Sequence, residues 1–173
     1  MHIRKLTFRP FQQILTLSIA LLLASCSMNP AYQGRGEAGI QGEWQQDTTS
    51  AQKKLVSYAL YHFRFDCDSF YVQMHTFSKV NYGADTCMRN GHWTEYAKGR
   101  YEVQSDTLHL KGFFTLKSGK LKDEGGCFRS GVYEERFKFS KKTDSLYQFT
   151  NTTSVTPFTI HLTKRITCNP KPL

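Results

Sequence analysis

The sequence predicts an all-β protein, an eight-stranded antiparallel up-and-down barrel that follows an export signal and a short tether. From residue 40 onward, short runs rich in Tyr, Phe, Val and Thr recur about every eight to twelve residues, separated by turn-forming residues. Within these runs apolar residues alternate with polar ones, so each strand has one apolar face. Eight such strands cover their apolar faces best by closing into a ring, which also removes the unpaired sheet edges.

The candidate strands follow one another with mostly short connections. Three connections are rich in Asp, Ser or Thr, whose side chains bond to nearby backbone and favour reversal of the chain: residues 66–69, 105–106 and 141–144. Neighbouring strands are therefore expected to be antiparallel. The candidate strands are 41–46, 59–65, 69–77, 93–103, 107–116, 131–140, 145–151 and 158–166.

The remaining connections are longer. Residues 78–92 and 117–130 each contain glycines and a cysteine, and both are expected to lie at a rim of the barrel. Residues 50–58 are the segment expected to form a helical turn, because Ser50 can cap it and good helix formers follow.

The alternation also predicts which side chains point into the barrel. Tyr61, Phe63 and Phe65 form a wholly aromatic face of the second strand, which is expected to point inward. Aromatic residues occupy many other inward positions, which favours a barrel filled by its own side chains over a hollow one. Five inward residues are the candidates for contact with an apolar ligand, with the tyrosine hydroxyls orienting it: Tyr61, Phe63, Tyr101, Tyr133 and Tyr147.

Two pairs of carboxylates are candidates for chemistry. Glu134 and Glu135 are adjacent on a strand, so one of them is expected to point inward, where it would orient a ligand. Asp66 and Asp68 straddle Cys67 on a turn. Paired carboxylates can act as acid and base, but at this spacing on a turn they are better explained as caps of backbone amides.

The first 25 residues have the organisation of an export signal, with a basic n-region and an apolar segment, residues 14–23, too short to span a bilayer. The segment ends in Leu-Ala-Ser-Cys at residues 23–26, which resembles the lipobox of bacterial lipoproteins. The resemblance implies cleavage before Cys26 and acylation of that residue, so that several acyl chains hold the protein on a membrane. A plain secretory signal with an incidental cysteine is the alternative.

These features divide the chain into a signal peptide (1–25), a flexible tether rich in Gly, Ser, Asn and Pro (26–39) and one barrel domain (40–173). Cleavage would leave 148 residues with 20 basic and 14 acidic side chains, a net charge of +6. The basic residues are scattered over strand ends and turns. They suit a solvated surface, or contact with anionic lipid head groups or a polyanionic envelope glycan; nucleic acid is not an expected partner of an exported protein.

Four cysteines follow the proposed anchor. An even number in an oxidising compartment predicts two disulfides among Cys67, Cys87, Cys127 and Cys168. Three pairings are possible, and the preferred one joins Cys67 to Cys87, stapling a long loop to the preceding hairpin, and Cys127 to Cys168, near the C-terminus. No two of these cysteines have the close spacing of zinc ligands, and no paired histidines accompany them, so neither a metal nor a cofactor is predicted.

Gly42-Glu43-Trp44, at the start of the first strand, resembles the Gly-x-Trp opening of the lipocalins and their bacterial lipocalin-like relatives. The resemblance implies that Trp44 plugs the closed end of the barrel and that a basic residue late in the last strand, Arg165 or Lys164, packs over it. Arg165 suits the stacking better. It is out of step with the inward residues of its strand, so this contact requires a bulge.

The whole chain also resembles a group of small Gram-negative lipoproteins that sometimes carry the name fumarate hydratase. That name implies a hydro-lyase, yet the known types of fumarase use either a Gly-Ser-Ser-x-Met-Pro-x-Lys-x-Asn loop in a long helical tetramer or an iron–sulfur cluster. Neither is visible here. An enzyme is therefore the less favoured interpretation, and no catalytic residue is assigned.

Two functions remain from the sequence. The preferred one is a membrane-anchored binding protein that holds a small apolar or amphipathic molecule in its barrel. The other is a structural or interaction lipoprotein with a filled barrel. Ser27, which follows Cys26, is not the aspartate of the inner-membrane retention signal, so the outer membrane is the expected location, with either face open.

Overall fold

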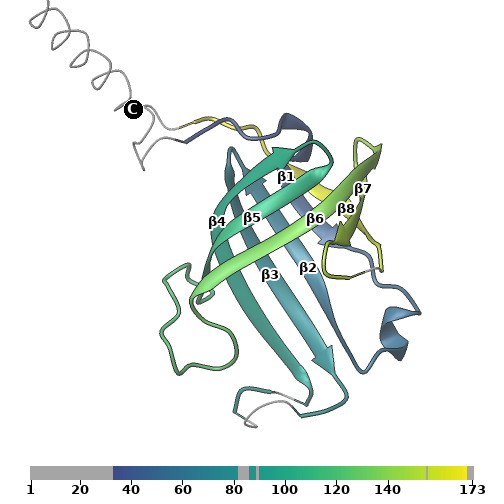
Figure 1. Cartoon of the computed structure of the whole chain (residues 1–173), viewed down its shortest axis with the longest axis vertical. Helices are drawn as coiled ribbons and strands as arrows, with labels where there is room; N and C mark the ends of the chain where they lie inside the picture. The colour runs from purple at the N-terminus through teal and green to yellow at the C-terminus, as the bar shows by residue number, and fades with distance from the viewer. Residues whose placement is uncertain (1–32, 82–85, 89, 155, 171–173) are drawn as a thin grey trace, which may run out of the picture. The chain divides into compact units, whose positions relative to one another are not determined.

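The computed structural model describes residues 33–81, 86–88, 90–154 and 156–170 (Figure 1). The predicted signal peptide, Cys26 and residues 27–32 of the tether lie outside the described residues. In the described part, eight antiparallel strands follow chain order around a closed barrel, so the prediction of an all-β, up-and-down barrel is confirmed. The strands are β1 (Gly42–Gln46), β2 (Ser57–Asp66), β3 (Ser69–Ser78), β4 (His92–Gln104), β5 (Thr107–Thr115), β6 (Val132–Thr143), β7 (Leu146–Asn151) and β8 (Phe158–Arg165).

The strand boundaries depart little from those expected. The largest difference is in β6, which runs to Thr143 because a register shift between Lys141 and Thr143 lets it continue pairing with β7. The helical turn expected over residues 50–58 is much shorter, a 3-10 turn η3 (Gln52–Lys54). Thr49 and Gln52 cap it reciprocally through their side chains, and β2 begins at Ser57.

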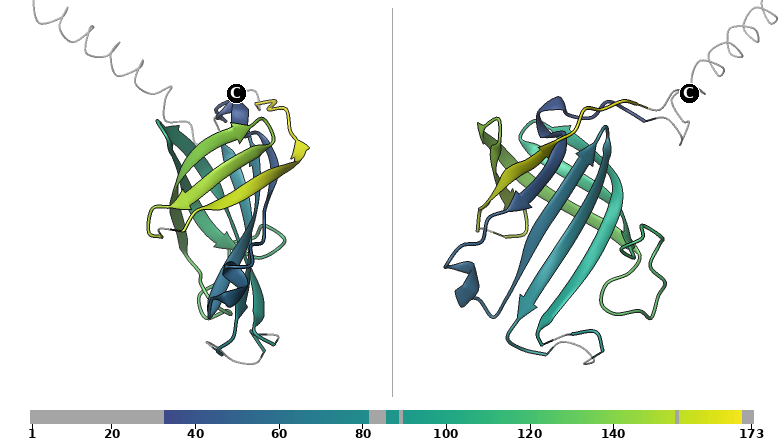
Figure 2. Two further views of the ribbon diagram at one scale, coloured as in Figure 1. Left: turned by 90° about the vertical axis from the view of Figure 1, so that its right-hand side faces the viewer. Right: turned by 180° about the vertical axis from the view of Figure 1, so that it is seen from behind.

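The two ends of the barrel differ in their connections. Tight hairpins join β2 to β3, β4 to β5 and β6 to β7 at one end, where a second 3-10 turn, η2 (Ala38–Ile40), leads into β1. We call this the closed end. Four longer connections, residues 47–56, 79–91, 116–131 and 152–157, lie at the opposite end, which we call the mouth (Figure 2).

The closed end is plugged by Trp44. Its side chain is fully buried, its Nε1 donates to the Ile40 carbonyl at 2.7 Å, and the Arg165 guanidinium lies 5.8 Å from the ring centroid. The bulge that this contact requires is present, because Trp44 pairs with Leu162 while Glu43 pairs with Lys164, which leaves one extra residue in β8. Arg165, rather than Lys164, is therefore the basic partner, and it also donates to the Asp144 carbonyl at 2.7 Å.

Gly42 is required at this closure. Its φ of +146° belongs to the region that favours glycine, and a Cβ there would come within 2.6 Å of the Lys164 carbonyl oxygen. The close approach of β1 to β8 therefore depends on the missing side chain.

The inward faces are those expected from the alternation. Phe63 and Phe65 are fully buried and Tyr61 is partly buried, whereas Arg64 between them is exposed. Most of the other predicted inward positions are also buried and join one core cluster, with Val103, Phe139, Phe158 and Leu162 packed against it.

The preferred cysteine pairing is wrong. The disulfides join Cys67 to Cys168 at the closed end and Cys87 to Cys127 at the mouth. The preferred pairing would have linked opposite ends of the barrel, far beyond the Cα separation of about 7 Å that a disulfide can span. The first bridge holds the segment after β8 to the β2–β3 hairpin, and the second joins the two longest mouth loops.

Candidate ligand pocket at the barrel mouth

Large aromatic side chains fill the interior of the barrel. Phe63 stacks on Tyr61 with a centroid separation of 5.3 Å, and Phe137 lies 5.8 Å from Phe63 and 5.6 Å from Phe149. Small residues face inward at few positions. Two of them, Gly99 and Gly112, pair across β4 and β5 where Cβ atoms would collide with the neighbouring backbone. The interior is thus a packed core of the kind expected for a small barrel.

The five candidate ligand contacts do not form one site. Tyr101 belongs to the closed end, where its hydroxyl accepts hydrogen bonds from Gln41 Nε2 at 2.7 Å and from the Glu37 amide at 3.1 Å. Burial raises the pKa of Tyr101 to about 12. Tyr147 packs edge-on against Trp44 at 5.1 Å. These two tyrosines hold the closure together.

Tyr61 and Tyr133 instead surround Glu135, which points inward as expected for one of the two adjacent glutamates. Tyr61 donates to Glu135 Oε2 at 3.3 Å, and Asn151 Nδ2 donates to the same oxygen at 3.4 Å. The Tyr133 hydroxyl is buried beside this group without a hydrogen bond of good geometry. Glu134 points outward and pairs with Arg136 at 3.0 Å.

Burial raises the pKa of Glu135, although the charge of Arg129 and the tyrosine hydroxyls oppose the shift. A carboxyl group whose pKa is higher in the folded state stabilises the fold relative to the unfolded chain at low pH, and this contribution is lost as pH rises through the folded pKa. The neutral mimic Glu135→Gln should therefore gain stability relative to the wild type as pH rises from 4 to 7.

Urea unfolding at several pH values measures this difference. The matched control is Glu134→Gln, which changes the same chemical group on the outer face and should show no comparable gain. Equal pH dependence of the two variants would contradict the assignment of Glu135 as a buried, destabilised carboxylate.

Arg129 holds the connection between β5 and β6 against the barrel mouth through Glu95. The guanidinium donates to Glu95 from Nη2 at 2.9 Å and from Nε at 3.2 Å, and the Arg129 backbone amide adds a bond of 3.0 Å to the same carboxylate. Glu95 is only 5% exposed, whereas half of the Arg129 side chain reaches solvent. The guanidinium also lies 4.9 Å from the Phe114 ring centroid.

Two further contacts hold this loop beside β4. Trp93 stacks on Phe128 at 4.4 Å, and the Trp93 indole donates to Glu95 Oε2 at 3.3 Å. The disulfide between Cys87 and Cys127 then joins the loop to the β3–β4 connection. Because a ring stack, an ion pair and a covalent bond act on one short stretch, the loop has a defined position over the edge of the mouth.

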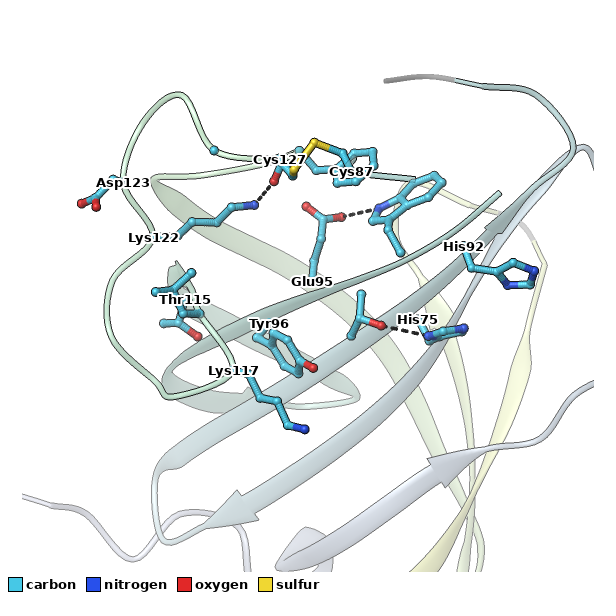
Figure 3. A pocket seen from close by; sticks show the side chains of 15 residues that line it. His75, Cys87, His92, Glu95, Tyr96, Thr115, Lys117, Lys122, Asp123 and Cys127 are labelled. Atoms are coloured by element: carbon cyan, nitrogen blue, oxygen red, sulfur yellow. Dashed lines mark hydrogen bonds between the residues drawn. A yellow bond between two sulfur atoms is a disulfide. The ribbon is translucent and has the colours of Figure 1, made fainter. Parts of the chain in front are cut away.

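A pocket of about 650 Å³ lies between this loop and the outer face of β4 and β5 (Figure 3). Aromatic and aliphatic side chains supply much of its lining, including Trp93, Tyr96, Leu116 and Phe128. Thr115 lies at its base, 2% exposed, and its hydroxyl has no hydrogen-bond partner. A buried polar group without a partner costs free energy. The Thr115 oxygen has almost no accessible surface, so a molecule in the pocket reaches this hydroxyl only by displacing the side chains that cover it.

The polar edges of the pocket carry both lysines and histidines. Lys117 and Lys122 come from the loop, and Lys122 Nζ also donates to the Cys127 carbonyl. His75 and His92 lie on the strand side with their rings 6.0 Å apart, and His75 bonds Thr94 at 2.9 Å. Burial, and then the neighbouring His92, lowers the pKa of His75.

The sequence reasoning missed this pocket because it considered only the barrel interior. Thr115 and Tyr96 are cross-strand partners on the outer face, a position that strand alternation assigns to solvent. Only the fold-back of the loop, through the Thr115–Leu121 bridge, covers them. The glycines and the cysteine of residues 117–130 were the available signal, since a loop pinned by a disulfide can form a wall.

The remaining candidates have structural roles. Asp68 accepts a bond from the Gly34 amide at 2.9 Å and lies near Arg100, while Asp66 pairs with Arg64 on the surface. The two carboxylates therefore hold separate partners. Within the described ranges, no group of three or more His, Cys, Asp or Glu side chains is arranged to hold a metal ion.

Comparison of the chain with family models, with curated proteins and with solved structures finds no match. Among the residues that the structure describes, no helix is long and apolar enough to cross a membrane. The functional argument therefore rests on the geometry of the pocket itself.

Proposed function

We propose that the protein is a membrane-anchored envelope lipoprotein that binds a small amphipathic molecule in the pocket at the mouth of its barrel. The observation that carries the proposal is the pocket of about 650 Å³, with aromatic rings in its lining and lysines at its edge. This volume lies within the range of about 300–1,000 Å³ that is usual for small-molecule sites.

The lining indicates the chemistry of the ligand. The rings of Trp93, Phe128 and Tyr96 suit an apolar body. The buried Thr115 hydroxyl can donate one hydrogen bond to a carbonyl or hydroxyl that displaces the side chains covering it. Lys117 and Lys122 at the edge suit an anionic head group. Glu95 contributes by fixing Trp93 and the loop, since its oxygens already accept from the indole and from Arg129.

This proposal places the ligand beside the barrel rather than inside it. The aromatic core leaves the expected interior contacts, such as Phe63, packed against neighbouring rings. The mouth loop supplies the apolar surface that the interior does not offer. The membrane anchor at Cys26 belongs to the same proposal and is supported by the lipobox-like sequence.

Mass spectrometry of the protein purified from its native envelope tests both parts. We expect a stoichiometric small molecule to co-purify, and an N-terminal peptide that begins at Cys26 and carries acyl chains. Thr115→Val should weaken binding of an amphipathic probe such as anilinonaphthalene sulfonate about fivefold, which corresponds to about 1 kcal/mol for one hydrogen bond.

Thr150→Val is the matched control, because Thr150 lies in β7 and does not line the pocket. Equal probe affinity for the two variants, together with no co-purifying molecule, would exclude the pocket as a ligand site. An unmodified Cys26 would remove the anchor and leave the binding proposal intact.

The second candidate is a structural or interaction lipoprotein, which the packed aromatic interior favours. In that case the wild-type protein would carry no small molecule and the probe would not distinguish the two threonine variants. The hydratase interpretation stays a prediction from resemblance, and a spectrophotometric assay of fumarate with detection of malate tests it.

A further inference from the structure

We infer that the mouth of the barrel docks onto an anionic lipid bilayer. Its first support is the distribution of exposed apolar side chains. Among the described residues, the large hydrophobic side chains that are exposed all belong to the mouth loops or to strand residues next to them: Leu55, Val56, Val80, Phe113, Leu116, Leu121 and Val132. Clustering of exposed apolar residues at one end of a molecule marks an interaction surface.

The first group of these residues spans two loops. Leu55 and Val56 are 49% and 56% exposed and precede β2, and Val80, which follows β3, is 44% exposed. Two hydrogen bonds join the loops, from the Lys79 amide to the Val56 carbonyl at 2.9 Å and from Lys79 Nζ to the Lys54 carbonyl at 3.2 Å. The three aliphatic side chains therefore belong to one connected surface.

The second group belongs to the β5–β6 connection. Leu116 and Leu121 lie on this loop at 50% and 61% exposure, and Phe113 and Val132 are cross-strand partners on the outer face where the loop begins and ends. We call the two groups together the mouth rim. Figure 1 shows the connection 116–131 and the connection 47–56 on different sides of the mouth, so the two groups belong to opposite parts of the rim.

Charge is distributed along the same axis. The four mouth connections contain eight basic and four acidic residues, a net charge of +4. The three hairpin turns at the closed end contain Asp68, Asp106 and Asp144 and no basic residue, a net charge of −3. Two of these aspartates have basic partners beside the turns, Asp68 with Arg100 and Asp144 with Lys141. It is therefore the net positive charge of the mouth that attracts an anionic surface.

The lysines of the rim are available for such a surface. Lys53, Lys54, Lys117 and Lys120 are exposed, and no carboxylate in the described part of the chain lies within ion-pairing distance of them. Lysines beside exposed aliphatic residues match a bilayer, because the aliphatic groups enter the interfacial region while the ammonium groups stay with the phosphates. Exposed apolar side chains on separate loops, together with lysines that have no acidic partner among the described residues, favour a lipid surface over a protein partner.

The position of the tether determines which end of the domain is free to contact the bilayer. Residues 33–41 are held at the closed end, with the Gly34 amide on Asp68 and Gln41 Nε2 on the Cys67 carbonyl. A chain anchored through Cys26 would thus leave the domain from the end opposite the rim. Leu116 and Lys117 belong both to the rim and to the pocket lining, whereas Lys53, Lys54 and Leu55 belong to the rim alone. Docking would bring the pocket to a source of amphipathic molecules.

Quenching of tryptophan fluorescence by brominated lipids tests the inference. The full chain is incorporated into phosphatidylcholine vesicles, and acceptor vesicles of brominated phosphatidylglycerol are then added. Both reporters carry Trp93→Phe, because the native Trp93 lies at the mouth. The rim reporter Leu55→Trp should then be quenched, whereas the reporter Lys142→Trp at the closed end should not. Brominated phosphatidylcholine acceptors should quench neither reporter appreciably.

The charge variant Lys53→Glu/Lys54→Glu, in the Leu55→Trp background, should raise the acceptor concentration for half-maximal quenching by roughly twentyfold or more. The matched control Lys138→Glu/Lys142→Glu carries the same change of net charge away from the mouth and should remain close to the parent. Equal behaviour of the two variants, or equal quenching by neutral acceptors, would overturn the inference.

Analytical ultracentrifugation of the protein without lipid tests whether the mouth rim binds another protein chain instead of a bilayer. If the rim variants dissociate an oligomer and the rim reporter is not quenched, the surface joins protein chains and the lipid inference is wrong. Normal probe binding by the Lys53→Glu/Lys54→Glu variant would show that a failure of docking leaves the proposed ligand binding intact.

Discussion

Replacing Cys67 and Cys168 together by alanine is expected to lower the free energy of unfolding by about 4–5 kcal/mol. The bridge joins residues 101 positions apart, and loop-closure entropy predicts a cost of this size for a loop of about 100 residues. The bridge also ties the segment after β8 to the hairpin that holds residues 33–41, through the Cys67 amide and Gln41 at 2.7 Å. Urea unfolding with a far-ultraviolet circular dichroism signal measures the loss.

The second bridge provides the control. Cys87 and Cys127 are 40 positions apart and join two mouth loops, which regain freedom in the native state when the bridge is removed. The global loss for the Cys87→Ala/Cys127→Ala variant should therefore be smaller, about 1–3 kcal/mol. Its main effect should be on probe binding, because both cysteines line the pocket. A larger global loss for this pair than for Cys67 and Cys168 would contradict the assignment of roles.

Trp44→Ala should have the next largest effect on stability, a loss of about 3–5 kcal/mol. The side chain is fully buried, donates to the Ile40 carbonyl, packs edge-on against Tyr147 and lies beneath the Arg165 guanidinium. Truncation leaves a cavity at the plug and an unbonded carbonyl. Thermal and urea unfolding both report the change.

Two comparisons separate packing from other causes. Trp44→Phe keeps most of the buried aromatic surface and should lose less than the alanine variant. Trp93→Ala removes the same side chain from the partly exposed mouth, where it stacks on Phe128, and should affect probe binding more than global stability. A Trp44→Ala variant within about 1 kcal/mol of the wild type would show that Trp44 does not hold the closed end.

The barrel itself was predictable because its signals are local. Alternation in runs such as 61–65 assigns side chains to faces without any knowledge of distant residues, and Asp- and Ser-rich turns set the antiparallel order. The inward position of one of Glu134 and Glu135 followed from the same alternation. The contact of Arg165 with Trp44 needed one further condition, the bulge in β8, which the structure contains.

The order of the strands also decides which cysteines can pair. In an up-and-down barrel, successive connections alternate between the two ends. Cys67 follows β2 and Cys168 follows β8, which places both at the closed end, whereas Cys87 and Cys127 lie in the connections after β3 and β5 at the mouth. The preferred pairing of Cys67 with Cys87 would staple a long loop to the preceding hairpin, but it is wrong because these two cysteines lie at opposite ends of the barrel.

The sequence by itself determined the strands and their inward faces, because each depends on neighbours a few positions apart. Acylation of Cys26 stays a prediction from the sequence. The tertiary structure alone decided the pocket and the mouth rim. Thr115 lies on an outer face and is buried only because residues 116–131 fold back over it. Leu55 and Val80 belong to one surface only because hydrogen bonds join their two loops. Such contacts depend on paths of loops through space, which local patterns of residues do not encode.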